Sequence, residues 1–322
     1  AEELKKGTKI AVPRKIKLDI ENKYFFELMD LIKVEDKLYV PFDEEYKNIA
    51  FKVKGNGMWK DVSSKLNIPI NVFRGLVDKQ SINFAYLIKI LRESGLKNED
   101  MIKLIPYIKA KNQNIKYKVP WKNSKEFSRF FGYLIAEGRL PPESDQIWFT
   151  NGTEEIVEDY KSLVDGLFEV KSTINEYKSG CWDVLAYSAP IRTILNKFGM
   201  SIGATGDKTL TNLFLSHSDE EELVEFLDGY YSGDGYVGKS VIEVTTKSKK
   251  LGEAVENILS RLGILHNSSL KVKIATNSGF SGIYKIISIY GVENFSKFYS
   301  KIKFTHKEKQ GKLESVLNLK SN

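Results

Sequence analysis

Two acidic residues, Glu137 and Asp234, occupy equivalent positions in two similar nine-residue segments. The segments read FFGYLIAEG at 130–138 and LDGYYSGDG at 227–235. Small residues four positions apart in each segment share one helix face, so two such helices can approach almost backbone to backbone. The last turn of a helix carries partial negative charge, and a carboxylate there costs roughly 0.3–1 kcal/mol. Pairing the helices would also make the two acids repel. A divalent cation would reverse both penalties, so the pattern predicts a metal site.

A glycine follows the acid in each segment, Gly138 in the first and Gly235 in the second. Glycine at this position is typical of a helix that ends in the left-handed conformation. We therefore expect both helices to end there with positive φ, and we place Gly138 and Gly235 beside the acids in the metal site.

The surroundings of the two segments match, which indicates an internal repeat. Each segment is followed by a strand (147–150 or 241–245) and then by a helical stretch that ends near Phe168 or Ile264. Two alternating apolar strands and a closing helix come next. They span 173–177, 181–188 and 189–198 in the first copy, and 270–276, 284–290 and 292–302 in the second. The pattern predicts an α+β fold made of two pseudo-symmetric αββαββα halves.

These residues resemble the LAGLIDADG homing endonucleases, in particular the branch encoded within inteins. The resemblance covers roughly 124–319 and includes both motifs, with the acid at the eighth position of each. It implies two curved antiparallel sheets that form a saddle over DNA, with the motif helices as the central interface. We accordingly expect an accessory domain at 1–119, a first half at 120–200 and a second half at 201–322.

The resemblance also implies the chemistry. Two or three Mg²⁺ ions, replaceable by Mn²⁺, would be shared by Glu137 and Asp234 to hydrolyse a phosphodiester. A lysine from each half would polarise the water or the phosphate. In the intein branch one such lysine precedes the second motif, and Lys208 stands there, although the proline that follows it in the family pattern is missing.

The second lysine is chosen by spacing. From Glu137 to Lys208 is 208 − 137 = 71 residues, and the same step from Asp234 reaches 234 + 71 = 305, beside Lys307. We therefore choose Lys307 as the catalytic lysine of the second half. The alternative candidates are Lys303 and Lys309.

Charge favours a polyanionic partner. The net charge is +7 with a pI near 9.0, and 103–129 alone holds eight basic residues and one acid. We interpret 103–129 as a linker that contacts DNA phosphates, with a solvated linker as the alternative. The residues expected to bind DNA are Lys109, Lys111, Lys116, Lys118, Lys122 and Arg129 in this segment, and Trp148, Lys247, Lys271 and Lys273 in the two halves.

The N-terminal third predicts a mainly helical accessory DNA-binding domain. Residues 58–79 have the spacing of a helix-turn-helix, with 70–79 as the recognition helix; a purely structural helix pair is an equal alternative. Further helices are expected over 84–94 and 98–109. Residues 4–15 resemble the segment through which inteins pass from their splicing domain into the endonuclease.

Other classes of protein are disfavoured. A single cysteine excludes an internal disulfide, and the three histidines, at 217, 266 and 306, are too scattered for a zinc site. No stretch is apolar for the roughly 18 residues that a membrane helix needs, and no signal peptide is visible. We expect a cytoplasmic protein associated with nucleic acid.

The function expected from the sequence is therefore that of a monomeric, site-specific double-strand DNA endonuclease of intein or intron homing. It would cut a long asymmetric site across the minor groove and leave short 3′ overhangs. The first alternative is a maturase-like protein that binds DNA or RNA on the same scaffold without cleavage. A weaker alternative is a transcriptional regulator. Intact acids in both motifs favour the enzyme, because a decayed copy is free to lose a carboxylate that destabilises its helix end.

Overall fold

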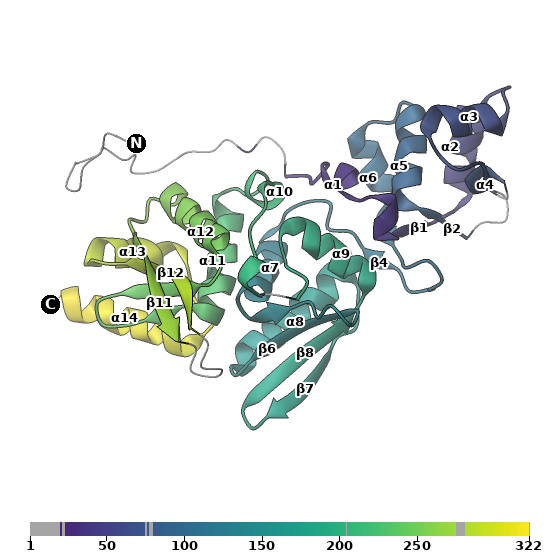
Figure 1. The fold of residues 1–322 in the computed structure, drawn as a ribbon. Helices are drawn as coiled ribbons and strands as arrows, with labels where there is room; N and C mark the ends of the chain where they lie inside the picture. Colours follow the sequence, from purple (N-terminus) through teal and green to yellow (C-terminus); the bar gives the residue numbers. More distant parts are fainter. Residues whose placement is uncertain are drawn as a thin grey trace.

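A computed structural model describes residues 20, 23–74, 76, 80–203, 205–274 and 281–321. Figure 1 shows a helical N-terminal part followed by two halves of mixed helix and sheet. The halves meet at helices α7 (Lys125–Glu137) and α11 (Glu220–Asp234), which we call the motif helices. No helix in these described ranges is long and apolar enough to cross a membrane.

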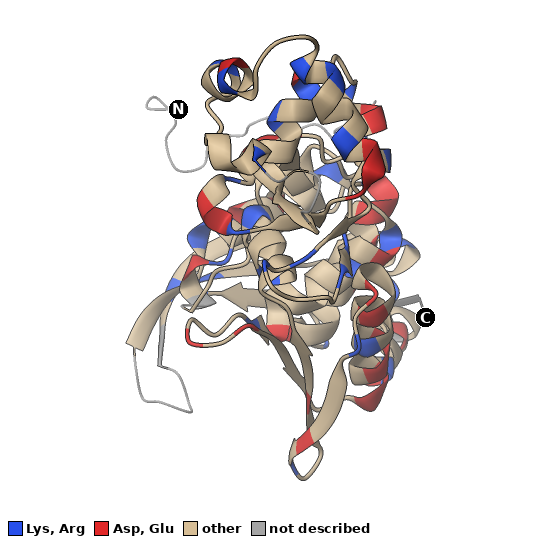
Figure 2. Cartoon of the chain, turned by 90° about the vertical axis from the view of Figure 1, so that its right-hand side faces the viewer, with Lys and Arg blue, Asp and Glu red and all other residues tan. Residues whose placement is uncertain are grey.

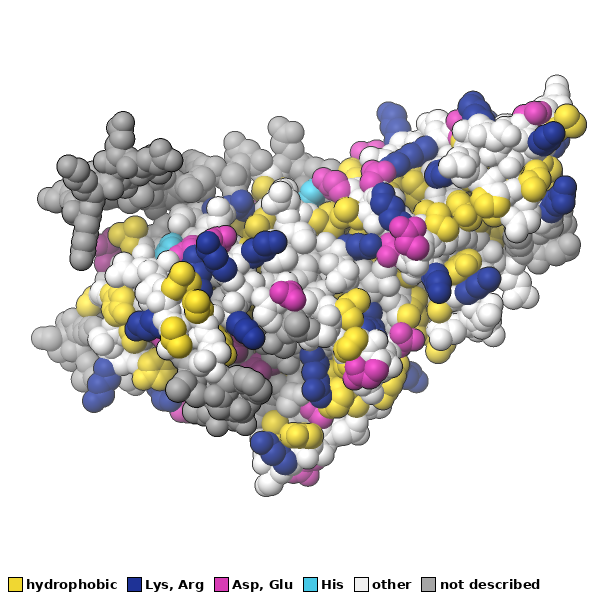
Figure 3. Space-filling view, in the orientation of Figure 1, with side chains coloured by type: hydrophobic (Ala, Val, Ile, Leu, Met, Phe, Trp, Pro, Cys, Tyr) yellow, Lys and Arg dark blue, Asp and Glu magenta, His cyan; other side chains and the backbone are white. Residues whose placement is uncertain are grey.

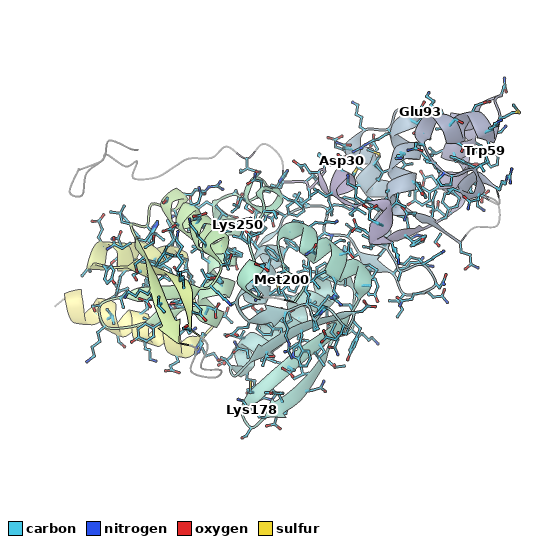
Figure 4. All side chains as sticks on the ribbon, viewed as in Figure 1. Asp30, Trp59, Glu93, Lys178, Met200 and Lys250 are labelled. Carbon is cyan, nitrogen blue, oxygen red and sulfur yellow. The ribbon has the colours of Figure 1, made fainter. Side chains whose placement is uncertain are left out.

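The N-terminal part is mainly helical, as predicted. Its elements are α1 (Leu28–Leu31), η1 (Val34–Asp36), β1 (Tyr39–Pro41), α2 (Glu44–Lys54), α3 (Trp59–Leu66), α4 (Ile70–Phe73), β2 (Ser81–Asn83), α5 (Phe84–Glu93), α6 (Asn98–Leu104), β3 (Tyr107–Ile108) and β4 (Tyr117–Lys118). The side chain of Asp43 accepts hydrogen bonds from the N–H groups of Glu45 and Tyr46, which caps the start of α2. Strands β1 and β2 pair antiparallel, and α5 packs on them. Trp59, at the start of α3, lies at the outer end of this part (Figure 4).

The predicted helix-turn-helix is present only in part. Helix α3 is followed by Asn67, whose φ of 49° is left-handed, and α4 begins three residues later. Helix α4 spans four residues and ends before Arg74, which is extended with ψ 118°. The recognition helix expected over 70–79 is therefore much shorter than predicted, and 75 and 77–79 lie outside the described residues.

Each half has the predicted αββαββα order. The first half contains α7, β5 (Gly138–Arg139), β6 (Gln146–Asn151), α8 (Glu154–Phe168), β7 (Thr173–Lys178), β8 (Cys181–Tyr187) and α9 (Ala189–Phe198); the second contains α11, β9 (Tyr236–Val237), β10 (Ile242–Thr246), α12 (Lys249–Arg261), β11 (Asn267–Ile274), β12 (Ser281–Ile289) and α13 (Val292–Lys301). The strand orders, β5-β6-β8-β7 and β9-β10-β12-β11, are equivalent. The fold class is confirmed. From residue 199 onward, three elements lie outside this repeated pattern and were not predicted: η2 (Thr205–Asp207), α10 (Asn212–Leu215) and α14 (Lys307–Ser321).

The two faces of each sheet differ. Val244 pairs with Ile287, and both are buried on the face that the helices cover. Glu243, next to Val244 on β10, and Trp148, at the equivalent position of β6, point to the opposite face and are only half-buried. The long hairpins β7–β8 and β11–β12 project from the same side of the molecule (Figures 1 and 2), and Lys178 lies at the tip of the first (Figure 4). Each half therefore presents an open sheet face, as a saddle requires.

Residues before the predicted domain boundary also pack into the two halves. The fully buried ring of Phe25 lies 4.7 Å from that of Phe198 and 5.8 Å from that of Phe127, centroid to centroid. Two residues earlier, Lys23 Nζ lies 2.5 Å from Asp219 Oδ2, at the start of α11. The division at 119/120 stays a prediction, but the core of the first half includes a ring from the N-terminal part.

We expect Phe25→Ala to destabilise the chain by about 3–5 kcal/mol, the usual range for truncating a buried phenylalanine. Unfolding in denaturant, followed by near-UV circular dichroism, would measure it. The control is Phe51→Ala, since Phe51 is 45% exposed and its loss should change the free energy of unfolding far less. Equal effects of the two variants would show that Phe25 does not anchor the N-terminal part to the first half.

Candidate active site

The motif helices touch backbone to backbone, as the sequence predicts. A Cβ atom built on Gly132 would lie 2.3 Å from the carbonyl oxygen of Phe226. A Cβ on Gly229 would lie 2.3 Å from that of Arg129. One turn further on, a Cβ on Gly233 would lie 2.6 Å from the Cβ of Ala136 and 3.3 Å from Cγ of Glu137. The contact therefore continues to the ends of both helices and brings the two acids together.

The closing glycines differ from the prediction. Gly138 has φ −83° and ψ 160°, and Gly235 has φ −74° and ψ 148°, so both are extended rather than left-handed. The chain passes straight from each helix into the short strands β5 and β9. Glycine is needed there for a steric reason, because a Cβ would lie 2.5 Å from the carbonyl oxygen of Leu134 or 2.4 Å from that of Tyr231.

Glu137 and Asp234 open into one cleft of about 320 Å³. The cleft is lined by Ile135, Ala136, Glu137, Gly138, Arg139, Lys208, Asp234, Thr245, Thr246, Lys247, Leu251 and Tyr284. Both acids are exposed toward the cleft, so water, a cation or a phosphate can reach their carboxylates.

The surroundings of the acids favour their protonated forms. Burial, and next the charge of Glu137, raise the pKa of Asp234 to about 7. Burial also raises the pKa of Glu137, against the opposing charges of Lys208 and Lys309. The carboxylates are reachable from the cleft yet enclosed by protein on their other sides, which accounts for the upward direction of both shifts. A divalent cation between them would favour the ionised forms.

Lys208 lies beside the acids, where the sequence places it. Its Nζ donates a hydrogen bond to the carbonyl oxygen of Ile135 at 2.7 Å, in the last turn of α7. Burial lowers the pKa of Lys208 to about 8, although Asp234 and Glu137 favour the charged form. The side chain therefore caps one motif helix and also lines the cleft.

Lys309, and not Lys307, takes the equivalent place in the second half. Its Nζ donates to three carbonyl oxygens at the end of α11, those of Tyr231 at 3.1 Å, Ser232 at 2.6 Å and Gly233 at 2.8 Å. Burial lowers the pKa of Lys309 to about 8. Lys307 points elsewhere: its side chain is 79% exposed, and Nζ lies 2.8 Å from Oε1 of Glu155. The choice of Lys307 is thus corrected, because residues two apart on α14 face different directions.

The two lysines change the electrostatic argument for a metal. From the sequence, the partial negative charge of each helix end counted against the acids. In the structure an ammonium group already satisfies the carbonyls at each of these ends. What remains to favour a cation is the enclosure of the acids and their mutual repulsion.

The donor set fits Mg²⁺. The cleft offers two carboxylates, those of Glu137 and Asp234. Within the described residues, no group of three or more His, Cys, Asp and Glu side chains could hold a metal ion. Mg²⁺ is usually held in this way, by one or two carboxylates plus water and substrate phosphates. The carbonyl groups of Gly138 and Gly235 follow the acids directly, and their predicted part in the site stays a prediction.

Arg139 was not identified from the sequence. Its guanidinium lies 3.6 Å from the centroid of the Trp148 ring, its cross-strand neighbour on β6. Arg139 is exposed, lines the cleft and makes no ion pair among the described residues. A positive charge is thus held beside the two acids. The equivalent position in the second half, 97 residues on, is Tyr236, so the repeat itself did not signal a basic residue here.

The basic segment 103–129 is a folded connection and not a free linker. It contains the end of α6, the hairpin of β3 and β4, and the start of α7. Arg129 lies at the interface of the motif helices, with Nε 3.1 Å from Oδ2 of Asp159 and Nη1 3.4 Å from Oε2 of Glu225. Lys109 is 7% exposed. The expectation that Arg129 and Lys109 bind DNA is therefore corrected, since Arg129 is held in ion pairs and Lys109 is buried.

The other four lysines of this segment that were predicted to bind DNA are exposed. Lys118 Nζ lies 3.4 Å from Oε1 of Glu169, and Lys122 Nζ stacks over an aromatic ring. Lys111 and Lys116 are exposed in the β3–β4 connection and have no ion-pair partner in the described part of the chain. On the face of the molecule drawn in Figure 3, basic side chains are scattered and do not gather in one patch. A phosphate-contacting role now depends mainly on Lys111 and Lys116, and it stays a prediction.

The basic and aromatic residues predicted on the two halves lie along the sheets and the cleft. Trp148 points to the open face of the first sheet, and Lys247 lines the cleft. Lys271 is exposed on β11, opposite Tyr284. The side chain of Lys273 lies outside the described residues. Their contacts with DNA stay predictions.

One protein-family model matches the chain. Residues 221–303, from α11 to the end of α13, match the LAGLIDADG-like domain. Two solved structures show weaker likenesses. Mesophilic variants of the homing endonuclease I-DmoI align with a TM-score of 0.43 and 14% identity over 55% of this chain and 95% of theirs. Full-length DUF199/WhiA from Thermatoga maritima aligns with a TM-score of 0.41 and 14% identity over 62% of each chain.

Curated relatives match over only a small part of their own length. The replication factor C small subunit of Methanocaldococcus jannaschii is 29% identical over 195 residues, 60% of this chain and 10% of that protein. The protein of the same name from Thermococcus kodakarensis is 27% identical over 60% of this chain and 21% of its own length. The glutamine–fructose-6-phosphate aminotransferase of Methanocaldococcus jannaschii is 25% identical over 62% of this chain and 18% of its own length.

Proposed function

We propose that this chain, whose residues 221–303 match the LAGLIDADG-like domain, is a site-specific endonuclease that hydrolyses both strands of DNA with Mg²⁺. One observation carries the proposal: two carboxylates, on helices in backbone contact, share a cleft with a buried lysine and an exposed arginine. This combination suits phosphodiester hydrolysis, because the reaction needs cation ligands and basic groups for the developing phosphate charge.

Each side chain has a role in the proposal. Glu137 and Asp234 would hold divalent cations at the junction of the motif helices. Bound there, the cations supply activated water and neutralise charge on the leaving oxygen. Lys208 and Lys309 would orient the water or the scissile phosphates, one in each half. Arg139, held by Trp148, would contact a phosphate oxygen at the edge of the cleft.

The open sheet faces would bind the DNA. The two halves carry different residues at equivalent positions, such as Arg139 and Tyr236, so an asymmetric target suits them better than a palindrome. Both motifs belong to one chain, so a monomer can supply a complete cleft. Cleavage of the two strands across the minor groove would leave short 3′ overhangs, as in the family that the sequence resembles.

The curated relatives support a homing element. Proteins with unrelated names, replication factor C and an aminotransferase, share this segment over 10% and 18% of their own lengths. A segment shared by otherwise unrelated proteins is expected of an inserted mobile element. We therefore propose that the chain is the endonuclease of an intein, and that its target is the uninterrupted form of a host gene.

The test is cleavage of a library of long randomised DNA sites. With Mg²⁺ we expect one preferred site cut in both strands, and no cutting in EDTA. Selective binding of a site without cutting in Mg²⁺ or Mn²⁺ would replace the endonuclease by the non-cleaving alternative, a DNA- or RNA-binding protein on the same scaffold.

A second prediction concerns the corrected lysine. Lys309→Met should slow cleavage of one strand by about 100-fold, the scale of a lost acid–base or charge-stabilising group. Strand-specific end labels on the target would measure this.

The matched control is Lys307→Met, two residues away. Lys307 only pairs with Glu155 on the surface, so cleavage by this variant should stay within about twofold of the wild type. The reverse order of effects would restore Lys307 as the catalytic lysine.

A further inference from the structure

A buried carboxylate outside the cleft contacts the segment that carries Lys309. Asp228 lies on α11 and is 5% exposed. Its Oδ1 accepts a hydrogen bond from the backbone N–H of Thr305 at 3.1 Å, and its Oδ2 accepts one from the Thr305 hydroxyl at 3.2 Å. The hydroxyl of Ser232 also donates to Oδ1, at 3.0 Å. Two of its three hydrogen bonds therefore hold the residue that lies just before the start of α14.

The contact sets how this segment lies along α11. Thr305 and Lys309 are four residues apart, as are their partners Asp228 and Ser232. The chain from 305 to 309 thus runs beside one turn of α11 in fixed register. Because Lys309 reaches the end of the helix only in that register, the bond of Asp228 to Thr305 determines where the ammonium group lies.

Among its described residues, the first half has no equivalent carboxylate that holds the segment carrying its lysine. The position equivalent to Asp228, 97 residues earlier, is Phe131, whose ring packs on Phe127 and Phe214. The neighbourhood of Lys208 is held by backbone bonds instead, with the N–H of Thr209 donating to the carbonyl of Gly199 at 3.0 Å. A change at Asp228 would therefore disturb one lysine and leave the other in place.

We propose that Asp228 is a positioning residue for Lys309, acting through Thr305, and that it controls cleavage of one of the two DNA strands. The inference rests on the proposed function, because the strand is cut only if the chain is an endonuclease. It adds that the lysines of the two halves are held in place by different contacts. A change in that support would convert a double-strand endonuclease into a nicking enzyme.

The test uses the full chain with Asp228→Ala and Asp228→Asn. Asparagine can still accept from the Thr305 N–H, so it should partly rescue. On a supercoiled target plasmid, we expect Asp228→Ala to slow one strand about tenfold to 100-fold and the other by less than about threefold, since a small misplacement of a reacting group can cost about 10²-fold. Nicked circles should accumulate, cut in the same strand as with Lys309→Met and in the opposite strand to Lys208→Met.

A double-mutant cycle separates positioning from general damage. If Asp228 acts only through Lys309, Asp228→Ala combined with Lys309→Met should cut no more slowly than Lys309→Met alone. The matched control is Glu225→Ala, which removes another acid of α11, one that pairs with Arg129 and not with 305–309. It should leave the ratio of the two strand rates unchanged. Equal slowing of both strands by Asp228→Ala, or additive losses in the double variant, would overturn the proposal.

Amide hydrogen exchange gives a readout that does not need cleavage. Asp228→Ala should speed exchange in 302–310 by at least about tenfold, Asp228→Asn less, and Glu225→Ala not at all. If the wild-type chain cuts no DNA, the proposed function fails, and exchange alone decides whether Asp228 holds this segment. Unchanged exchange in Asp228→Ala overturns the inference whatever the cleavage result.

Discussion

Glu137→Gln and Asp234→Asn are each expected to reduce cleavage of both strands by about 10²–10³-fold with Mg²⁺, the size of the charge stabilisation that a bound cation supplies. The two carboxylates share one cleft at the junction of the motif helices, so losing either one removes half of the cation's protein ligands. DNA affinity should stay within about tenfold, because most protein–DNA contacts go to phosphates and base edges away from the cut. Single-turnover cleavage and filter binding would measure the two effects separately.

The control for this prediction is Glu225→Gln. Glu225 is a half-buried acid on the same helix as Asp234, but it pairs with Arg129 and does not line the cleft. Its replacement should leave both strand rates close to those of the wild type. Wild-type cleavage by Glu137→Gln or Asp234→Asn would remove that residue from the reaction.

The same acids should make the stability of the metal-free protein depend on pH. The pKa of Asp234 is about 7 in the folded chain against 3.8 for the unperturbed group. The folded state then binds the proton more tightly than the unfolded state. This contribution to stability is therefore fully present below about pH 4 and is lost as pH rises through 7.

Asp234→Asn removes that pH dependence. In the absence of metal, the melting temperature of the variant relative to the wild type should increase from pH 5 to pH 8. Adding Mg²⁺ at pH 8 should raise the melting temperature of the wild type more than that of the variant. Differential scanning fluorimetry would measure both effects. Parallel pH curves for the two proteins would show that Asp234 ionises in the folded chain without penalty.

The repeat explains why the two halves could be predicted from the sequence. Alternating strands such as 181–188 and helices such as 189–198 occur twice in the same order, so each copy supports the interpretation of the other. Contacts between small residues also follow from spacing, because Gly132 and Ala136 must share a helix face. The glycine after each acid was predicted correctly for the wrong reason. The backbone of this glycine is extended. Glycine is required because a Cβ would collide with the preceding helical turn, and not because φ is positive.

Side-chain partners far apart in the sequence could not be predicted. The charge of 103–129 suggested a DNA-binding linker, but its residues pair with acids from other elements, Arg129 with Asp159 and Lys118 with Glu169. Lys309 was missed as first choice because equal spacing in the two copies ignores the start of α14, which was itself not predicted. The corrections at Arg129 and at the second lysine both concern tertiary contacts that no local pattern encodes, whereas phosphate contact by Lys111 and Lys116 stays a prediction.

Gly229→Ala is expected to lower the free energy of unfolding by about 3 kcal/mol, the upper part of the range for overpacking. The added Cβ would lie 2.3 Å from the carbonyl oxygen of Arg129 and 2.9 Å from the backbone nitrogen of Tyr133. Backbone atoms, unlike the end of a flexible side chain, cannot move aside alone, so the motif helices must separate. Gly132→Ala should behave alike, because its Cβ meets the carbonyl oxygen of Phe226 at 2.3 Å.

A glycine-to-alanine substitution at another position should instead raise the free energy of unfolding. Gly166 lies within α8, and a Cβ there would meet no atom within 4 Å, so Gly166→Ala should stabilise by about 0.5–1 kcal/mol. Separation of the motif helices would also move Glu137 from Asp234. Gly229→Ala should therefore lose cleavage even at temperatures where it stays folded, while Gly166→Ala should cut normally. If both variants shifted the unfolding midpoint in the same direction, the backbone contact between the motif helices would not be what holds the two acids in one cleft.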